Sequence, residues 1–381
     1  MDSVSNTYDR LIPKSPVGST DAFGRLRTSG PFTLFDSQNR YAISNKFYSN
    51  VTGTGSVSFI STESSVLLTV NNGNVIRESK NVFAYQPGKS LLILSTFVMT
   101  TGPTYQRVGY FNDSNGIFVE YSNGTVYMCL RNNGSETKVA QSQWNTNKCP
   151  GLDITKAQIF WIDVEWLGVG SVRTGFVIDG VFITAHVFHN ANRLSAVYMT
   201  TAILPVRYEI SGTGTMKQIC TSVISEGGYD QKLPLFAQVR GTNSTNAVNL
   251  VTEGTVYPLI SIRLKSGYWD SIVKMKFIDL LVLSNDNITW YLIQNPVLTT
   301  PTWTSHTDSN VVEIDVSSSS ISGGRVIFSG YLSQKGTIQV PVDDIDFSIG
   351  RTNTASDVIT LAASAFNNNI KIGSMLSWIE I

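Results

Sequence analysis

Apolar and polar residues alternate along residues 158–190 in a pattern that predicts three antiparallel strands. Asp179-Gly180 separates two alternating runs, and this pair favours a type I′ turn because both residues tolerate positive φ. A two-residue turn places Ile178 opposite Val181. A third strand precedes this hairpin, across the short loop 168–170. The three strands share one apolar face, which we expect to lie on a core: Phe160, Ile162, Val164, Trp166, Val172, Thr174, Phe176, Ile178, Val181, Ile183, Ala185 and Val187.

The other face of these three strands carries polar residues. With a tight loop at 168–170, Glu165, Arg173 and His186 line up across the strands and form a structural polar ladder. Asp163 shares this face with Glu165. The rise per residue of a β-strand places the two residues roughly 6.5–7 Å apart. That spacing also suits an inverting glycosidase, and Trp161 beside it could stack a sugar. We favour the ladder, because cross-strand charge pairing accounts for these residues without a substrate.

Short alternating runs separated by turn residues continue along the rest of the chain. Asn123-Gly124 marks a second clear hairpin. Residues 217–225 are ambiguous but fit a strand better than a helix. The strands expected before residue 228 include 56–60, 65–71, 91–99, 117–121, 125–131, 196–201, 207–211 and 217–225. Those expected after it are 257–264, 273–283, 289–294, 311–316, 325–331, 337–340, 358–364 and a closing strand at 370–381.

These elements predict an all-β protein with two β-sandwich or jelly-roll-like domains and an extended N-terminal arm. The Gly227-Gly228 pair, followed by Leu233-Pro234, gives the best boundary. We therefore expect an arm at 1–30, a β-sandwich domain at 31–228 and a second β domain at 229–381.

Proline and glycine interrupt the first thirty residues, yet residues 21–41 place apolar side chains among arginines. A disordered linker would not usually carry so many aromatic residues. Two interpretations stay open: a strap across the chain's own domain, or an arm that docks on a neighbouring subunit. For the second, the expected interface residues are Phe23, Arg25, Leu26, Arg27, Phe32 and Phe35.

Charge is sparse and balanced, with 28 basic and 28 acidic residues among 381. This balance argues against nucleic acid or a membrane surface as a partner, and weak charge repulsion favours a homo-oligomer. The N-terminus lacks the features of a signal peptide, so we expect synthesis and folding in a cytoplasm. Three scattered cysteines are too few for a disulfide framework or a zinc site.

Motifs for catalysis or cofactor binding are weak. The run QPGKS at 86–90 has Phe83 where a phosphate-binding loop needs glycine, and a strand-like run follows it. The chain has three histidines and no Gly-x-Ser-x-Gly motif. We therefore expect no catalytic residues, no metal and no cofactor.

The run DAFGRLRTSGPFTLFDSQNRY at 21–41 resembles a set of uncharacterised virion structural proteins of tailed bacteriophages and large algal DNA viruses. Those proteins begin with an AFGRLR-x-S-x-PFTLFDS arm. Later segments of the chain extend the resemblance: WLGVGSVRTGFVIDG, ICTSVISEGGYD, VYPLISIRLKSG and SDVITLAA. The resemblance implies a non-enzymatic structural subunit in a virus particle, made in the host cytoplasm and bound to copies of itself and to other virion proteins.

Two other functions remain as alternatives. The first is a fibre or spike component that binds host surface glycans, for which the chain offers many tryptophans and tyrosines. The weaker one is a glycan hydrolase, which would depend on Asp163 and Glu165 alone.

Overall fold

The computed structural model describes residues 30–228, 234–342, 348–352 and 354–381. Nearly all of its regular structure is β, as the sequence predicts. Across the described ranges the other regular element is a single 3₁₀ turn, Gln141–Gln143. In that same part of the chain, no helix has the length and apolarity needed to traverse a bilayer.

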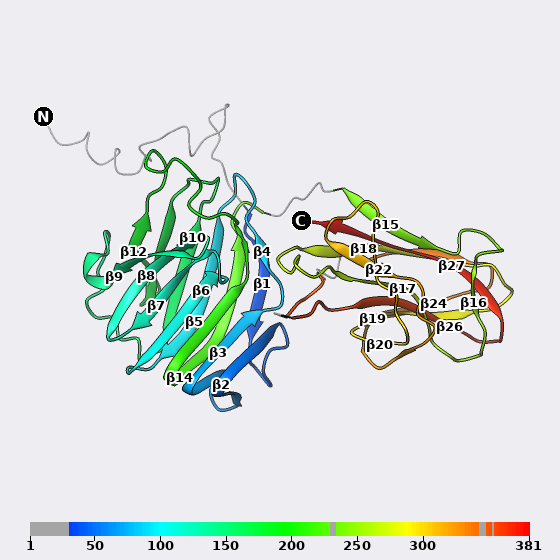
Figure 1. The fold of residues 1–381 in the computed structure, drawn as a ribbon, viewed down its shortest axis with the longest axis horizontal. Helices are drawn as coiled ribbons and strands as arrows, with labels where there is room; N and C mark the ends of the chain where they lie inside the picture. Colours follow the sequence, from blue (N-terminus) through cyan, green and yellow to red (C-terminus); the bar gives the residue numbers. More distant parts are fainter. Residues whose placement is uncertain (1–29, 229–233, 343–347, 353) are drawn as a thin grey trace, which may run out of the picture.

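A sheet of twelve strands forms the N-terminal β unit (Figure 1). A short pair, β4 (Phe83–Ala84) and β13 (Ile203–Leu204), accompanies it. The sheet contains β1 (Phe32–Gln38), β2 (Phe47–Ile60), β3 (Ser65–Ser79), β5 (Leu91–Met99), β6 (Thr104–Phe111), β7 (Gly116–Ser122), β8 (Thr125–Asn132), β9 (Ser135–Ala140), β10 (Gln158–Val164), β11 (Val172–Ile178), β12 (Val181–Phe188) and β14 (Val206–Ser225).

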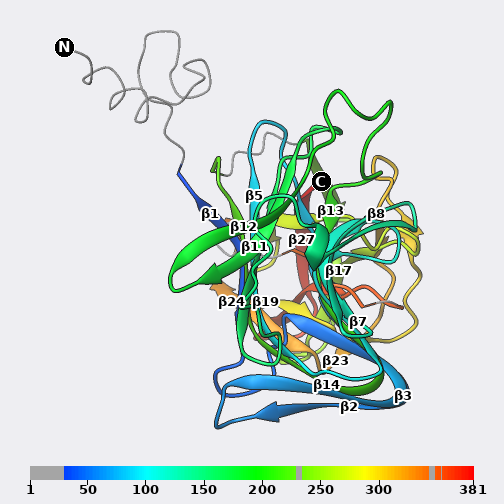
Figure 2. The same cartoon turned by 90° about the vertical axis from the view of Figure 1, so that its left-hand side faces the viewer.

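Strand β14 is the central strand of this sheet and pairs with four other strands. Its first half lies between β6 and β3, and its second half lies between β5 and β1. Register shifts between Gly212 and Thr213 and between Gln218 and Thr221 interrupt its ladders. Such irregularities let a strand bend from one sheet layer into another. Viewed from its end, the sheet curls, with β11 and β12 on one side, β7 and β8 on the other, and β2, β3 and β14 between them (Figure 2).

The curled sheet encloses one hydrophobic core drawn from both of its halves. Phe97, Val119, Phe176 and Val206 are fully buried within it. Phe35 of β1 also lies in this core, only 7% exposed, with its ring 5.7 Å from Phe47 and 4.9 Å from Phe83. The residues around Phe35 therefore form a strap on the chain's own domain.

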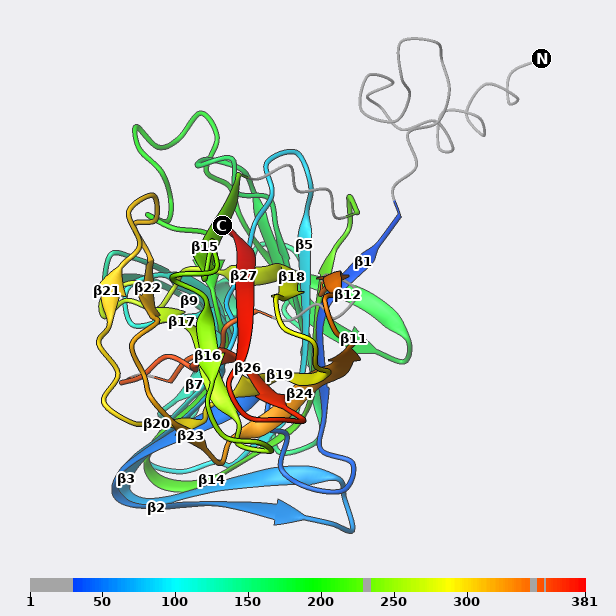
Figure 3. The same ribbon diagram turned by 90° about the vertical axis from the view of Figure 1, so that its right-hand side faces the viewer.

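The C-terminal β unit is a sandwich of two sheets around a second core. One sheet contains β15 (Leu235–Arg240), β16 (Val248–Leu250), β18 (Val273–Val282), β25 (Thr337–Pro341) and β27 (Ile370–Glu380). The other contains β17 (Tyr257–Leu264), β19 (Ile288–Gln294), β21 (Thr304–Ser305), β22 (Val312–Asp315), β24 (Arg325–Leu332) and β26 (Ile359–Ala365). A separate short pair is β20 (Val297–Leu298) with β23 (Ile321–Ser322). Figure 3 shows β15, β16 and β27 toward the viewer, with β21 and β22 on one side and β24 on the other.

The positive φ angles predicted for the two hairpin turns are confirmed. Asp179 and Gly180 have φ of 52° and 76°, and Asn123 and Gly124 have φ of 49° and 83°. Two strand predictions need correction. Residues 196–201 form bends and irregular backbone instead of a strand, and 207–211 and 217–225 are parts of the single strand β14.

Candidate functional site

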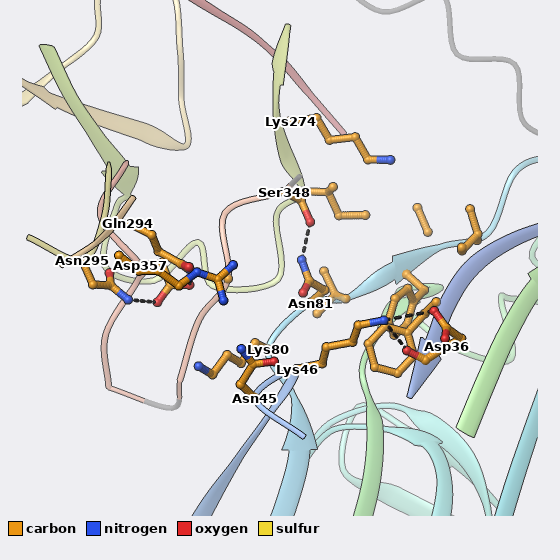
Figure 4. Close-up of a pocket in the computed structure, with 18 of the residues that line it drawn as sticks. Asp36, Asn45, Lys46, Lys80, Asn81, Lys274, Gln294, Asn295, Ser348 and Asp357 are labelled. Carbon is orange, nitrogen blue, oxygen red and sulfur yellow. Dashed lines mark hydrogen bonds and ion pairs between the residues drawn. The ribbon is translucent and has the colours of Figure 1, made fainter. Parts of the chain in front are cut away.

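A polar pocket of about 670 Å³ lies where the two β units meet (Figure 4). The strap residues 33–36 and the segment 80–84 line it from the N-terminal unit. Lys274, Asn295 and Asp357 are among the residues that line it from the C-terminal unit.

Most charged groups in the pocket already have protein partners. The Lys46 ammonium donates to the Asp36 carboxylate at 3.0 Å. The Asp357 carboxylate accepts hydrogen bonds from the side-chain amides of Gln294 and Asn295, each at 2.7 Å. The pocket is therefore mainly a satisfied polar junction.

Hydrogen bonds join the two units directly beside the pocket. The Asn81 side-chain amide donates to the Ser348 hydroxyl, and the Arg351 backbone N–H donates to the Lys80 carbonyl at 2.9 Å. The Arg351 guanidinium contacts Glu78 of the N-terminal unit at 2.8 Å and Asp270 of its own unit at 3.1 Å. Glu78 and Arg351 are 3% and 6% exposed, so this ion pair is shielded from water.

The Glu78–Arg351 pair is one end of a chain of charges that crosses the outer side of β14, β6, β7 and β8. Successive contacts connect Arg351, Glu78, Arg207, Glu209 and Arg107, at distances between 2.8 and 3.8 Å. We call the whole set the ion network: Glu78, Arg107, Asp113, Glu120, Arg131, Glu136, Lys138, Arg207, Glu209, Asp270 and Arg351.

Aromatic rings lie under the arginines of this network. Phe111 and Phe118 pack against each other at 4.5 Å between ring centroids. The Arg131 guanidinium lies 5.0 Å from the Phe118 centroid, and that of Arg207 lies 5.4 Å from the Phe111 centroid. Cation–π contact allows a charge to pack on an apolar surface, which explains why so many charged groups are buried here.

Burial and pairing oppose each other within the network. Burial raises the pKa of Glu78 above its ordinary value, and the charges of Arg207 and Arg351 offset only part of that rise. Burial also disfavours the charged form of Arg207, but Glu78, Glu209 and Asp113 outweigh it and raise the Arg207 pKa. Each charge in the network therefore depends on its neighbours.

The structure corrects the predicted polar ladder of Glu165, Arg173 and His186. Strand β10 ends at Val164, so Glu165 lies in the loop, and Arg173 pairs with Asp163 in both register and ion contact. The β11–β12 register follows the two-residue turn as far as Gly175 and then shifts past Ala185. His186 consequently faces Thr174 instead of Arg173.

The same bulge exchanges the faces at the end of β12. Phe188 joins the core opposite Val172, and the predicted core residue Val187 turns outward opposite Arg173. Asp163 is 6% exposed and paired with Arg173. The Glu165 carboxylate instead accepts a hydrogen bond from the Ser171 backbone at 3.4 Å.

Outward-facing residues of the β12–β11–β10–β5–β14 half of the sheet form a largely apolar surface. The strand registers align it in rows, such as Gly175–Trp161–Leu94–Ser222 and Val177–Ile159–Thr96. We call it the outer apolar face and define it by Leu92, Leu94, Ile159, Trp161, Val177, Phe182 and Ile224. These seven residues lie on the side opposite the enclosed core. Phe182 is 53% exposed and Ile159 is 38% exposed.

The corrected pairing can be tested with double-mutant cycles. We expect Asp163→Ala and Arg173→Ala to show a coupling energy of about 0.2–1 kcal/mol, because the Arg173 side chain is largely exposed. Glu165→Ala with Arg173→Ala should show coupling close to zero. Urea unfolding of the single and double variants measures both values, and the reverse order of couplings would restore the ladder predicted from the sequence.

The predicted arm interface falls into two parts. Phe23, Arg25, Leu26 and Arg27 lie outside the described residues. Phe32 is 40% exposed at the start of β1. Phe35 cannot contact a neighbouring subunit, because it is buried in its own core. Its alternation with the exposed Asp36 on a β strand could have indicated this.

Sequence reasoning missed the ion network and the pocket. The network was signalled by charged residues that alternate with apolar ones inside strands, such as Arg207 and Glu209 in β14. Their meeting with Arg351 depends on chain segments far apart in sequence.

Comparisons with known proteins do not assign this chain to a family. No protein-family model matches the chain, and no curated protein matches it. Solved structures with a related arrangement include a protein of unknown function from Shewanella oneidensis (10% identity, TM-score 0.36, covering 61% of this chain and 99% of that one). A glycosyl hydrolase family protein from Mycobacterium fortuitum matches with 9% identity and a TM-score of 0.36, over 50% of this chain and 99% of that one. The CBM2 module of the Dit protein of Lactobacillus casei phage J-1 matches with 4% identity and a TM-score of 0.39, over 54% of this chain and all of that one. Similarity at this level does not extend to function.

Proposed function

We propose that this chain is a structural subunit of a virus particle and acts by assembling with copies of itself and with other virion proteins. The outer apolar face carries the proposal. A solvent-facing side of an antiparallel sheet normally bears polar residues, whereas this one presents Leu92, Leu94, Ile159, Val177 and Phe182. Contiguous apolar surface of this kind is typical of interaction sites. The resemblance of the segment 21–41 to virion proteins supports the choice of a virus particle.

Deletion of residues 1–30 tests this proposal. We expect the truncated protein to fold, because β1 begins at Phe32 and the core starts at Phe35. We also expect it to be lost from particles, because the arm would no longer reach a neighbour. Incorporation is measured by quantifying the subunit in purified particles, with circular dichroism and thermal unfolding as controls for folding. Normal incorporation of a folded truncated protein would contradict the proposal.

Glycan binding is a second candidate, favoured by the exposed ring of Phe182, which packs on the ring of Trp161, only 4% exposed, on the same face. The centroids of Trp161 and Phe182 lie 5.6 Å apart. A glycan array and a cell-adsorption assay with the isolated protein discriminate between the two functions. Binding that Phe182→Ala abolishes would favour recognition of host glycans, whereas no binding together with stable homo-oligomers would favour assembly.

A further inference from the structure

We infer that the outer apolar face is the docking site for the N-terminal segment of this chain, residues 21–29. The inference rests on the proposed function and names the surface that receives the arm. Its support is the point where the chain enters the face, the apolar character of both surfaces, and the charges at one end of the face.

The chain enters the fold at the edge of this face. Phe32 pairs with Ser225 at the end of β14, and β1 is the edge strand on that side of the sheet. Gly30 lies against Gly228, with its carbonyl oxygen 3.4 Å from the position that a Cβ would take there. Figure 2 shows β1, β11 and β12 on the same side of the curled sheet, and Figure 3 agrees.

The segment is long enough to cross the face. An extended chain advances roughly 3.3 Å per residue, so Phe23 can reach about 23 Å from Gly30. The six strands from β1 to β12 span about 24 Å at about 4.8 Å between neighbours. The reach of residues 21–29 therefore matches the width of the face.

Both surfaces are apolar where they would meet. The segment supplies Phe23 and Leu26. The face supplies side chains that remain partly exposed in the folded unit, including Leu94, Val177 and Phe182. Covering exposed apolar area is favourable in proportion to the area removed from water.

Acidic groups gather at the end of the face where the chain enters. Asp163 faces Leu92 of β5, which faces Ile224 of β14, so Asp163 and Glu165 lie across the sheet from the strand end that Glu226 follows. Burial raises the pKa of Asp163 most, and the charges of Glu226 and Glu165 add to that rise. In the described part of the chain, Arg173 is paired with Asp163, and the Lys89 ammonium donates to the Gly228 carbonyl at 3.3 Å. Within the described residues, the Glu165 and Glu226 carboxylates accept hydrogen bonds from the neutral groups of Ser171 and Ser90 and form no ion pair, which leaves a local acidic excess.

Arg25 and Arg27 would lie near this acidic end. They precede Gly30 by five and three residues, which corresponds to about 17 and 10 Å of extended chain. Guanidinium groups form strong charge-assisted hydrogen bonds with carboxylates. The charge pattern of the segment therefore matches that of the entry end of the face.

Photo-crosslinking of the full-length protein tests the inference. Benzoylphenylalanine replaces Phe23, and mass spectrometry maps the crosslinked peptides. We expect crosslinks to the peptides that contain Ile159, Val177 and Phe182. Phe182→Glu and Ile159→Glu should lower the yield by about tenfold, because a charge would have to be buried on docking. Tyr331→Glu is the matched control, since Tyr331 is 75% exposed on β24 of the other unit, and it should leave the yield unchanged.

A mixture of isotopically heavy and light protein separates the two sources of the segment. Crosslinks between heavy and light peptides, the result we expect from the proposed function, show docking on a neighbouring copy. Crosslinks of one isotope alone show docking within a chain and would overturn the inference. Crosslinks mapped elsewhere, or a yield that Phe182→Glu and Ile159→Glu leave unchanged, would overturn it.

Measuring particle incorporation alongside the crosslinks distinguishes a failure of this inference from a failure of the proposed function. If deletion of residues 1–30 blocks incorporation while the crosslinks map elsewhere, the docking face is wrong and the assembly function stands. If the crosslinks map to the face while the truncated protein is incorporated normally, the docking stands and the proposed function fails.

Discussion

Glu78→Ala is expected to lower the free energy of unfolding by about 3–5 kcal/mol, because it leaves Arg207 and Arg351 without a shared buried partner. Glu78 is 3% exposed and contacts Arg207 at 3.2 Å, Arg351 at 2.8 Å and the Tyr48 hydroxyl at 2.8 Å. Removing the Glu78 carboxylate leaves the positive charge of Arg207 unpaired inside the N-terminal unit. It also weakens the junction with the C-terminal unit, which Arg351 forms. Urea unfolding measures the loss.

The exposed pair Lys46–Asp36 supplies the matched control for Glu78. Its side chains are 47% and 68% exposed, so Asp36→Ala should cost only about 0–1 kcal/mol. Should Glu78→Ala fail to fold, Glu78→Gln retains the size and hydrogen-bonding ability of the side chain and should fall between the two. A cost below about 1 kcal/mol for Glu78→Ala would show that the network contributes little to stability.

Trp378→Ala should destabilise the C-terminal unit by about 3–5 kcal/mol, because it opens a cavity in that unit's core. Trp378 is fully buried on β27 and stacks on Phe236, while His306 contacts it edge-on at 5.0 Å. Its indole N–H donates to Glu380 at 2.9 Å. Because the two units have separate cores, hydrogen exchange should accelerate mainly within residues 234–381.

Tyr331→Ala is the control for Trp378, because Tyr331 is an aromatic residue of the same unit that is 75% exposed. It should change stability by less than about 0.5 kcal/mol. Equal acceleration of exchange in both units after Trp378→Ala would show that the units unfold as one.

Local sequence patterns predicted the strands and turns well. Asp179-Gly180 set the β11–β12 register because its turn geometry is dictated by two adjacent residues. That prediction failed beyond Gly175, where one extra residue, Ala185, is accommodated as a bulge that no local signal marks. The loop before β11 is longer than predicted, so Glu165 lies in the loop. Asp163 therefore pairs with Arg173 in the position predicted for Glu165.

Long-range features of the fold could not be predicted from local patterns. The ion network needs Glu78 and Arg351 to meet across 273 residues of sequence. The curl of the sheet depends on β14 passing between two different pairs of neighbours, which periodicity alone does not show. Likewise, the outer apolar face appears only when five strands are placed in order, since each strand contributes no more than two of its residues.

The placement of β14 has a consequence for how the protein is made. Strands β1, β3, β5 and β6 all pair with it, yet they precede it by between about 100 and 190 residues of synthesis. Until Ser225 has left the ribosome, these strands lack a common partner and expose unpaired edges. Pairings so distant in sequence close slowly, and unpaired strand edges are prone to aggregate. The N-terminal unit must therefore complete its fold late, when most of its own chain has already been synthesised.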